Sequence, residues 1–431
     1  MGWHGSHGVR TIAEPTVSMT NNKVIRHIIR ICCWAVFLTC SATIVSCSHS
    51  DGPSGKKKSN RVVLVYMVAE NSLASSQLDT EDIKEMLSGK NLIPDGDHLI
   101  IYHDGTSLPS LYDVTRKTKA NIVSELSPVK SWDEDVNSAS VETLNEVLQY
   151  VYGKYPAESY GLVMWSHGAG WMVYEPLNTN AHSRNPKTSF GIDNGNNTVT
   201  NAGARMNIKD MAQTLSQFGN IEYIMFDACF MQEIEVAYEL RNVTSYIIGS
   251  PAEIPGEGAP YKHIMSSLFS HTSPADIAFS YFNYFDTRIY KSGVVLSTVK
   301  TDELEHFADL MKELLVKYNV ADIETHGLFN YFEYDYYRNY QEMPDLYDMK
   351  GVMQRLLSPE DYDRWLTEFN KLVVGTYASD SWYTEFGRYD CRVDHEQCGG
   401  ITMYIPLGKY RLEKFDKHYC NTAWAQRMAT H

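Results

Sequence analysis

The sequence has little of what marks several classes of protein. Only 15 of its 431 residues are proline and 43% are hydrophobic, so there is ample apolar material for a packed core, which excludes a disordered or collagen-like chain. Basic residues are in the minority, with 38 Lys and Arg against 53 Asp and Glu. The net charge of −15 excludes a general nucleic-acid binder, because phosphate contacts require a basic face.

Two hydrolase signatures are also missing. The chain has no G-x-S-x-G sequence, the turn that carries the nucleophile of many serine hydrolases. It has no H-E-x-x-H sequence either, because His395 and Glu396 are not followed by a second histidine at the required spacing. The sequence therefore favours neither a serine hydrolase of that type nor a zinc peptidase.

The N-terminus has the pattern of an export signal. Three basic residues, Lys23, Arg26 and Arg30, precede an apolar run that ends at Ser46 and is too short to span a bilayer. We predict that residues 1–46 are a signal peptide, for which Met19 is an alternative start.

A cysteine follows the apolar run directly. The small residue Ser46 before Cys47 resembles a bacterial lipobox, in which Cys47 is acylated and becomes the mature N-terminus. Residues 47–59 are polar and suit a tether. We predict an exported lipoprotein, anchored to a membrane in the periplasm or at the cell surface. The alternative is an ordinary signal peptide or anchor with an incidental cysteine.

Strand and helix patterns alternate along the next two hundred residues. Apolar, β-rich runs occupy residues 61–68, 99–102, 160–165, 221–226 and 245–249. Between them lie segments in which apolar residues recur at helical spacing, at 73–88, 138–152, 208–218 and 232–240. This alternation predicts an α/β fold with a mostly parallel sheet between helices.

The remaining segments differ from this rhythm. We predict an α/β core over residues 60–262 and a mainly helical C-terminal region over 263–431, with a late strand at 400–406. Residues 172–206 show almost no helical pattern and many Asn residues, and loops of this length are usually functional or cleaved.

Reactive side chains follow two of the predicted strands. The strand 160–165 runs into His167 and Gly168, and the strand 221–226 runs into Cys229. Because ligands bind at the carboxyl ends of parallel strands, this His and Cys are able to face each other across a cleft, as a thiol nucleophile and its base require. We expect Cys229 to open a helix whose dipole lowers its pKa, and the N–H groups of Gly168 and Cys229 to bind an oxyanion.

Together these motifs resemble the clostripain family of cysteine peptidases, relatives of caspases, legumains and gingipains. The resemblance is carried by four stretches, Val65–Asn71, Trp165–Trp171, Phe226–Met231 and, more loosely, Gly249–Gly258. It implies a caspase-like fold and a peptide or protein substrate, with His167 as the catalytic histidine and Cys229 as the nucleophile.

The resemblance implies further roles. Asp227 is similar to the acid at the base of the primary specificity pocket, which selects Arg or Lys, and Glu253 lies in the matching pocket loop. The alternative for Asp227, two residues before the nucleophile, is a helix N-cap. Family members are often cleaved between the His and Cys blocks, where Arg184 and Lys187 are candidate sites for processing into two chains.

Metal and disulfide sites are less marked. Some members depend on calcium, but the oxygen-rich segment Asp193–Asn197 is typical of a turn, so we predict no metal site or other cofactor and leave calcium open. Cys391 and Cys398 are close enough in sequence for a small disulfide. We expect a monomeric cysteine endopeptidase. The alternative is a non-catalytic surface lipoprotein that binds peptide or glycan with the same fold.

Overall fold

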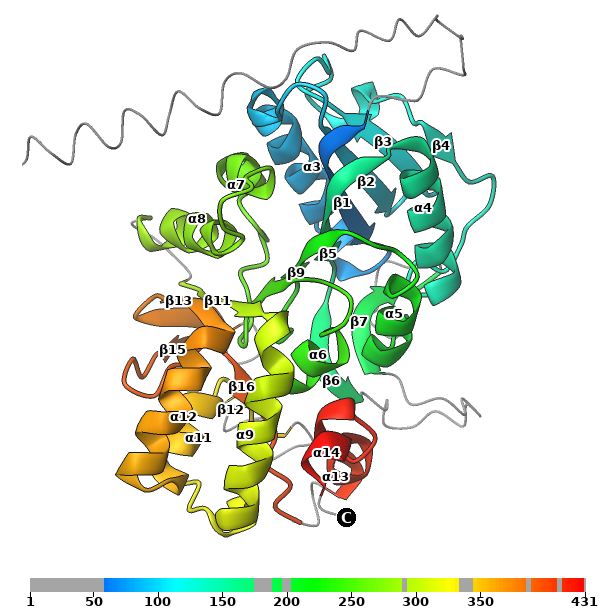
Figure 1. The fold of residues 1–431 in the computed structure, drawn as a ribbon. Coiled ribbons are helices and arrows are strands. Elements are labelled where there is room, and N and C mark those ends of the chain that lie inside the picture. The colour runs from blue at the N-terminus through cyan, green and yellow to red at the C-terminus, as the bar shows by residue number, and fades with distance from the viewer. Residues whose placement is uncertain are drawn as a thin grey trace, which may run out of the picture. The chain divides into compact units, whose positions relative to one another are not determined.

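The computed structural model describes residues 58–173, 188–195, 203–288, 293–332, 344–384, 389–408 and 413–429. Residues 56–431 form one compact unit (Figure 1). The predicted signal peptide, Cys47 and most of the predicted tether lie outside the described residues. Within the part of the chain that is described, no helix is long and apolar enough to cross a membrane.

A nine-stranded sheet is the centre of the described structure. In sheet order its strands are β13 (Val373–Ala378), β11 (Val295–Lys300), β10 (Tyr246–Gly249), β9 (Ile221–Asp227), β5 (Ala157–Trp165), β1 (Ser59–Val68), β2 (His98–Asp104), β3 (Ser110–Val114) and β4 (Lys130–Ser131). The five strands from β10 to β2 run parallel, and the strands at both edges pair antiparallel. The predicted α/β fold with a mostly parallel sheet is confirmed.

Strand β1 shows why the sheet is covered on both faces. Its side chains alternate between two separate hydrophobic clusters, with Val62 and Leu64 in one and Val63 and Val65 in the other. Successive side chains of a strand point to opposite faces, so a strand that is apolar throughout must be buried on both. This explains the unbroken apolar run of β1.

Helices supply the two outer layers (Figure 1). Side chains of four helices pack in the cluster with Val63: α2 (Ser72–Ser75), α3 (Leu78–Gly89), α7 (Tyr261–Leu268) and α8 (Ala275–Asp286). Side chains of the other face come from α4 (Val141–Lys154), α5 (Ile208–Leu215), α6 (Ile234–Glu239), α9 (Leu304–Lys317), α11 (Met349–Leu356), α12 (Pro359–Leu372), α13 (Glu413–Tyr419) and α14 (Ala423–Met428). Ser140 caps α4 by accepting from the Thr143 N–H, as a helix N-terminus requires.

The C-terminal region is mainly helical, but two of its strands, β11 and β13, extend the central sheet. The late strand is shorter than the predicted 400–406, because β16 covers only Thr402–Met403. It pairs with β12 (Tyr347–Asp348), and a separate hairpin joins β14 (Ser381–Thr384) to β15 (Tyr389–Arg392). Residues 263–431 therefore complete the fold of the core.

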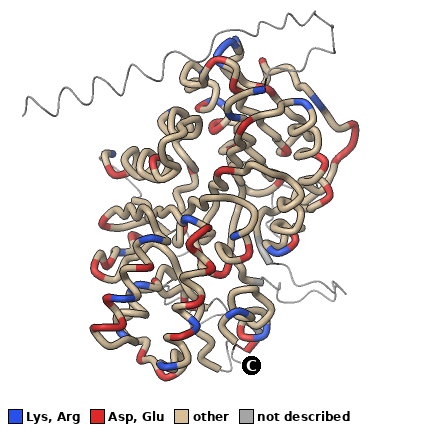
Figure 2. Tube along the Cα trace, in the orientation of Figure 1, with Lys and Arg blue, Asp and Glu red and all other residues tan. Residues whose placement is uncertain are grey.

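The long segment after His167 contains strands that its sequence did not indicate. Strands β6 (Gly168–Val173), β7 (Thr188–Asp193) and β8 (Ala204–Met206) form a small antiparallel sheet. Residues 174–187 and 196–202, including Arg184 and Lys187, lie outside the described residues. Figure 2 shows Lys and Arg interspersed with acidic residues along the described elements in this view.

Candidate active site

The two sequence blocks with reactive side chains lie side by side at the carboxyl edge of the sheet. Strands β5 and β9 are parallel neighbours, and their last residues, Trp165 and Asp227, are paired. The Ser166 N–H donates to the Asp227 carbonyl at 3.3 Å. His167 and Cys229 each follow two residues after this pair. The structure thus brings the His and Cys segments to one place, as the strand pattern predicts.

Gly168 lies directly against the Cys229 segment. A Cβ at position 168 would lie 2.6 Å from the Cys229 carbonyl oxygen and 3.0 Å from the Ala228 Cβ. These distances leave no room for a side chain, so the close approach of the two backbones requires glycine at this position.

His167 is held by contacts on both sides. Its Nε2 lies 3.0 Å from the Ser72 hydroxyl, in the first turn of α2 (Ser72–Ser75). Its carbonyl accepts from the Gly191 N–H at 3.0 Å. Burial lowers the pKa of His167 to about 4, and the nearby charge of Arg205 acts in the same direction. The imidazole is therefore neutral near pH 7.

Cys229 does not open a helix, so the predicted dipole effect on its pKa is wrong. Helix α6 begins five residues later, at Ile234. Burial raises the pKa of Cys229 to about 12, and the negative charge of Glu253 raises it further. The Ile254 N–H, 3.5 Å from Sγ, acts in the opposite direction. The residue after the cysteine, Phe230, has a φ of 59°, a left-handed conformation that is costly for a non-glycine residue.

Asp227 is buried, with 2% of its surface exposed. Its Oδ2 accepts from the Ala259 N–H at 3.1 Å and from the Tyr261 hydroxyl at 2.8 Å. These partners come from a distant segment, so the helix N-cap alternative is wrong. Its Oδ1 has no hydrogen-bond partner among the described residues. Burial raises the pKa of this carboxyl, while its two hydrogen bonds lower it.

A second buried carboxyl group, Asp82 of α3, lies near Asp227. Its Oδ2 accepts from the Trp165 indole N–H at 2.6 Å. Gly258 lies between the two acids, because a Cβ there would be 3.0 Å from Asp82 Oδ2 and 3.2 Å from Asp227 Oδ2. Burial raises the pKa of Asp82, and the charge of Asp227 raises it further. Asp82 could not be singled out from the sequence, because it has the pattern of an ordinary polar residue in an amphipathic helix.

Comparison with known proteins identifies the family. The model of the Clostripain family, Peptidase_C11, matches residues 65–430. A secreted C11 cysteine protease from Bacteroides thetaiotaomicron, solved in complex with an irreversible peptide inhibitor, is 30% identical; the match covers 86% of this chain and 98% of that chain, with a TM-score of 0.70. An inactive zymogen C11 protease from Parabacteroides distasonis is 27% identical; the match covers 87% of this chain and 99% of that chain, with a TM-score of 0.69.

The chain belongs to the clostripain family. The curated clostripain of Hathewaya histolytica is 26% identical over 240 residues, which are 50% of this chain and 43% of that protein. This chain thus spans less than half the length of that relative. The family match includes the His167 and Cys229 segments together with most of the C-terminal region.

In this clostripain-family chain, Glu253 follows β10 and is buried, with 6% exposed. It lies near Cys229, since its charge raises the pKa of the thiol. Two contacting residues were not singled out from the sequence: Ser72, which contacts His167, and Tyr261, which donates to Asp227. Ser72 comes directly after the matching stretch that ends at Asn71, and this position was the one available signal.

The predicted disulfide is not formed. Cys391 and Cys398 are not joined in the structure. Cys391 lies on β15, opposite Trp382 of β14. The Cys398 sulfur lies 3.3 Å from the Tyr331 hydroxyl, which donates to Asp348. Both cysteines lie in the same hydrophobic cluster as free thiols.

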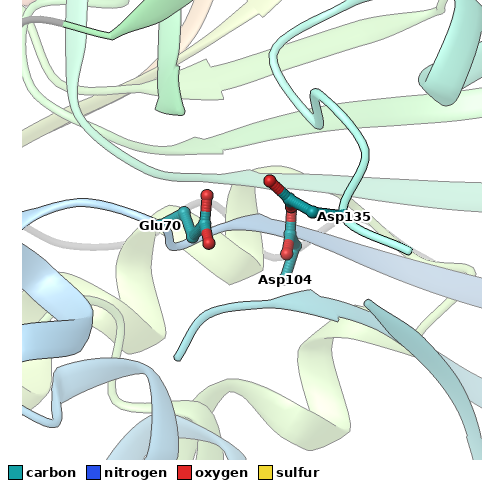
Figure 3. A group of neighbouring side chains, drawn as sticks. All are labelled: Glu70, Asp104 and Asp135. Carbon is teal, nitrogen blue, oxygen red and sulfur yellow. The ribbon is translucent and has the colours of Figure 1, made fainter. Parts of the chain in front are cut away.

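A group of carboxylates near the site is able to hold a metal ion. Glu70, Asp104 and Asp135 each offer an oxygen, and these atoms lie within 4.8 Å of one another (Figure 3). Asp193, the first residue of the oxygen-rich segment noted in the sequence, is close enough for its charge to raise the pKa of Asp104 and Asp135. Asn196 and Asn197 lie outside the described residues.

Proposed function

We propose that this protein is an exported cysteine endopeptidase that cleaves peptide bonds after Arg or Lys. Cys229 is the nucleophile and His167 the general acid and base. One observation supports the proposal: the parallel strands β5 and β9 end side by side, the segments that follow them carry His167 and Cys229, and β9 ends in the buried carboxylate Asp227, of which one oxygen has no partner among the described residues. The C11 cysteine proteases of similar structure support the same reaction.

The reaction begins with transfer of the Cys229 proton to His167. The thiolate then attacks the scissile carbonyl carbon, and the backbone N–H groups of Gly168 and Cys229 stabilise the oxyanion that forms. The contact between these two backbone segments supports this pairing of donors. The imidazolium protonates the leaving amine as the C–N bond breaks, and water hydrolyses the thioester that remains.

The charges around Cys229 link this chemistry to the substrate. In the free protein the thiol and the imidazole are both neutral, because burial raises the pKa of Cys229 to about 12 and lowers that of His167 to about 4. Glu253 and Asp227 contribute to the raised pKa of the thiol. A substrate cation bound beside these carboxylates would compensate their charge and so favour the thiolate.

The preference for Arg or Lys rests on Asp227 and Asp82. A buried carboxylate oxygen without a donor is unfavourable, and Asp227 Oδ1 has no donor among the described residues. Two adjacent acids with raised pKa values attract a cation, because a cation allows both to ionise. Gly258 lies against both carboxylates, where a Cβ would crowd Asp82 Oδ2 and Asp227 Oδ2. A guanidinium or ammonium group satisfies these conditions.

Hydrolysis of short fluorogenic peptides that end in Arg, Lys, Asp or Leu tests the proposal, with the Cys229→Ala variant as the control. Cleavage after Arg and Lys that disappears in the variant is expected. Cleavage after another residue would support Cys229 as the nucleophile but contradict the role of Asp227 in substrate selection. A folded protein that cleaves none of these peptides would favour the alternative, a binding protein for peptide or glycan.

Export and processing form part of the proposal. We infer acylation at Cys47 from its position after the apolar segment, and Cys47→Ala should release the protein from the membrane fraction. Unchanged membrane association would refute it. We also infer self-cleavage at Arg184 or Lys187. The Cys229→Ala variant should then remain a single chain, whereas two chains in this variant would require another protease.

A further inference from the structure

We propose that Glu233 is a positioning residue for His167 and Cys229, because its buried side chain holds the strand that follows His167 against the segment that follows Cys229. Strand β6 begins directly after His167, and Glu233 comes four residues after Cys229, just before helix α6. The inference rests on the proposed function, since positioning matters only if the thiol and the imidazole react together.

The Glu233 carboxyl group joins the two segments directly. Its Oε2 accepts from the Trp171 N–H of β6 at 2.9 Å. Gly170 has a φ of 60°, and a Cβ at this position would overlap the Glu233 carboxyl group. Both the left-handed conformation and the lack of space require glycine here. The chain that follows His167 is thus shaped to fit the Glu233 side chain.

Glu233 is part of the core. None of its surface is exposed, and its Oε1 has no hydrogen-bond partner among the described residues. Burial raises the pKa of this carboxyl group, and the charge of Glu235 raises it further, while the Trp171 N–H lowers it. We therefore expect Glu233 to be protonated at pH 7. A buried polar atom without a partner costs stability, and such costs are typical of functional positions.

The C-terminal region completes the surroundings of Glu233. The neighbouring acid Glu235 is also fully buried, and its Oε1 accepts from the Tyr404 N–H at 2.9 Å. The Trp171 ring packs against Tyr404 and against Tyr419 of α13, with centroids 5.0 Å and 5.7 Å apart. The titratable groups around Glu233 in the described part of the chain are therefore Glu235 and these two tyrosines. Strand β6 is held by Glu233 through its backbone and by the C-terminal region through the Trp171 ring.

The contact bears on catalysis because β6 carries the chain that fixes His167. The imidazole must meet the Cys229 thiol in one geometry, and a displacement of about 1 Å can reduce the rate of an enzyme roughly 100-fold. Glu233 ties β6 to the chain of Cys229, so the two reacting groups keep their relative position.

The proposed processing would make this contact more important. Cleavage at Arg184 or Lys187 would leave β6 near the end of the first chain, while Glu233 would belong to the second chain. The bond between Glu233 and the Trp171 N–H would then join two separate chains next to the catalytic pair.

Two substitutions of Glu233 test the inference. Glu233→Ala removes the contact with β6, and we expect kcat for an Arg peptide to fall about 30- to 100-fold, with KM changed less than about threefold. Glu233→Gln keeps an oxygen for the Trp171 N–H and resembles the protonated acid in size and charge. Its kcat and KM should both stay within about threefold of the parent values.

Glu239→Ala is the matched control. Glu239 lies on the same helix, and its Oε1 accepts from the Ala423 N–H at 2.7 Å, so it joins α6 to α14 instead of β6. This variant should lower the Tm and leave kcat unchanged. Equal losses of kcat in Glu233→Ala and Glu239→Ala, or a parental kcat in Glu233→Ala, would overturn the inference. If Glu233→Ala does not fold, Glu233→Asp replaces it, because its carboxyl group lies one methylene further from β6.

The protonation of Glu233 is tested by stability, in chains that carry Cys229→Ala. Because the pKa of Glu233 is raised above 4.5, the stability from its neutral form is complete below pH 4.5 and is lost as the pH rises through the raised value. Glutamine does not titrate. The Tm of Glu233→Gln relative to the parent should therefore rise by at least about 2 °C between pH 5 and pH 8. A constant difference would contradict a protonated Glu233.

Failure of this inference differs from failure of the proposed function. A parent protein that hydrolyses none of the fluorogenic peptides would contradict both. A parent that hydrolyses them, together with a Glu233→Ala variant of equal kcat, would contradict only the role of Glu233.

Discussion

Replacement of Asp227 by asparagine is the sharpest test of how this protein selects its substrate. Asn has nearly the same size and keeps an oxygen that can accept from Ala259 and Tyr261. What it removes is one negative charge next to Asp82. Loss of one partner of a buried ion pair costs about 3–5 kcal/mol. We therefore expect kcat/KM for an Arg substrate to fall roughly 150- to 5,000-fold, which is the rate equivalent of that range.

A neutral substrate should respond differently. Peptides that end in Leu make no ion pair, so their kcat/KM should change less than about threefold, and the Arg-to-Leu ratio should fall almost as much as the Arg value itself. Because the charge of Asp227 raises the pKa of Cys229, alkylation of the free thiol at pH 8 should become faster in the variant. Both results can be measured on one preparation.

The control for this prediction is Asp348→Asn. Asp348 is also fully buried and accepts from Tyr331 and from three backbone N–H groups, but none of these belongs to the candidate active site. Its replacement should lower stability and leave the Arg-to-Leu ratio unchanged. If Asp227→Asn likewise lowered stability and reduced both activities equally, Asp227 would have only a structural role, and the reasoning would be refuted.

Three further substitutions address His167 and its neighbours. Because the pKa of His167 is lowered from 6.5 to about 4, the stability that the neutral imidazole contributes is complete above pH 6.5 and is lost as the pH falls through 4. Urea unfolding should show that this loss reaches up to about 3 kcal/mol. The His167→Gln variant should not show this loss. Ser72→Ala should lower kcat about three- to tenfold with little change in KM, whereas a change in KM alone would exclude a positioning role. Gly168→Ala should reduce kcat/KM at least about 100-fold in a protein that still folds, because its Cβ displaces the Cys229 segment; near-normal activity would contradict this.

The fold and the meeting point of the reactive residues could be predicted because they depend on local pattern. The apolar runs that became β1, β5 and β9 are long, with Glu222 as the one charged residue within the β9 run, as is typical of strands buried on both faces. Topology then places whatever follows β5 and β9 at one edge of the sheet. No other information was needed to predict that the segments with His167 and Cys229 lie close together.

The environment of these residues could not be predicted in the same way. The pattern after Phe226 predicted a helix beginning at Cys229, but a turn with a left-handed Phe230 intervenes before α6. The pKa of the thiol therefore follows from burial and from Glu253, a residue 24 positions away, rather than from a helix dipole. Asp82 was missed for a related reason, because only tertiary packing brings it close to Asp227.

The charge of the buried acids Asp227 and Asp82 fits one kind of occupant. Asp227 Oδ1 is a buried carboxylate oxygen without a partner among the described residues. The pKa values of both carboxyl groups are raised by burial, so a shared proton leaves one negative charge between them. A single positive charge from a substrate side chain matches that charge, and this match supports the proposed preference for Arg or Lys.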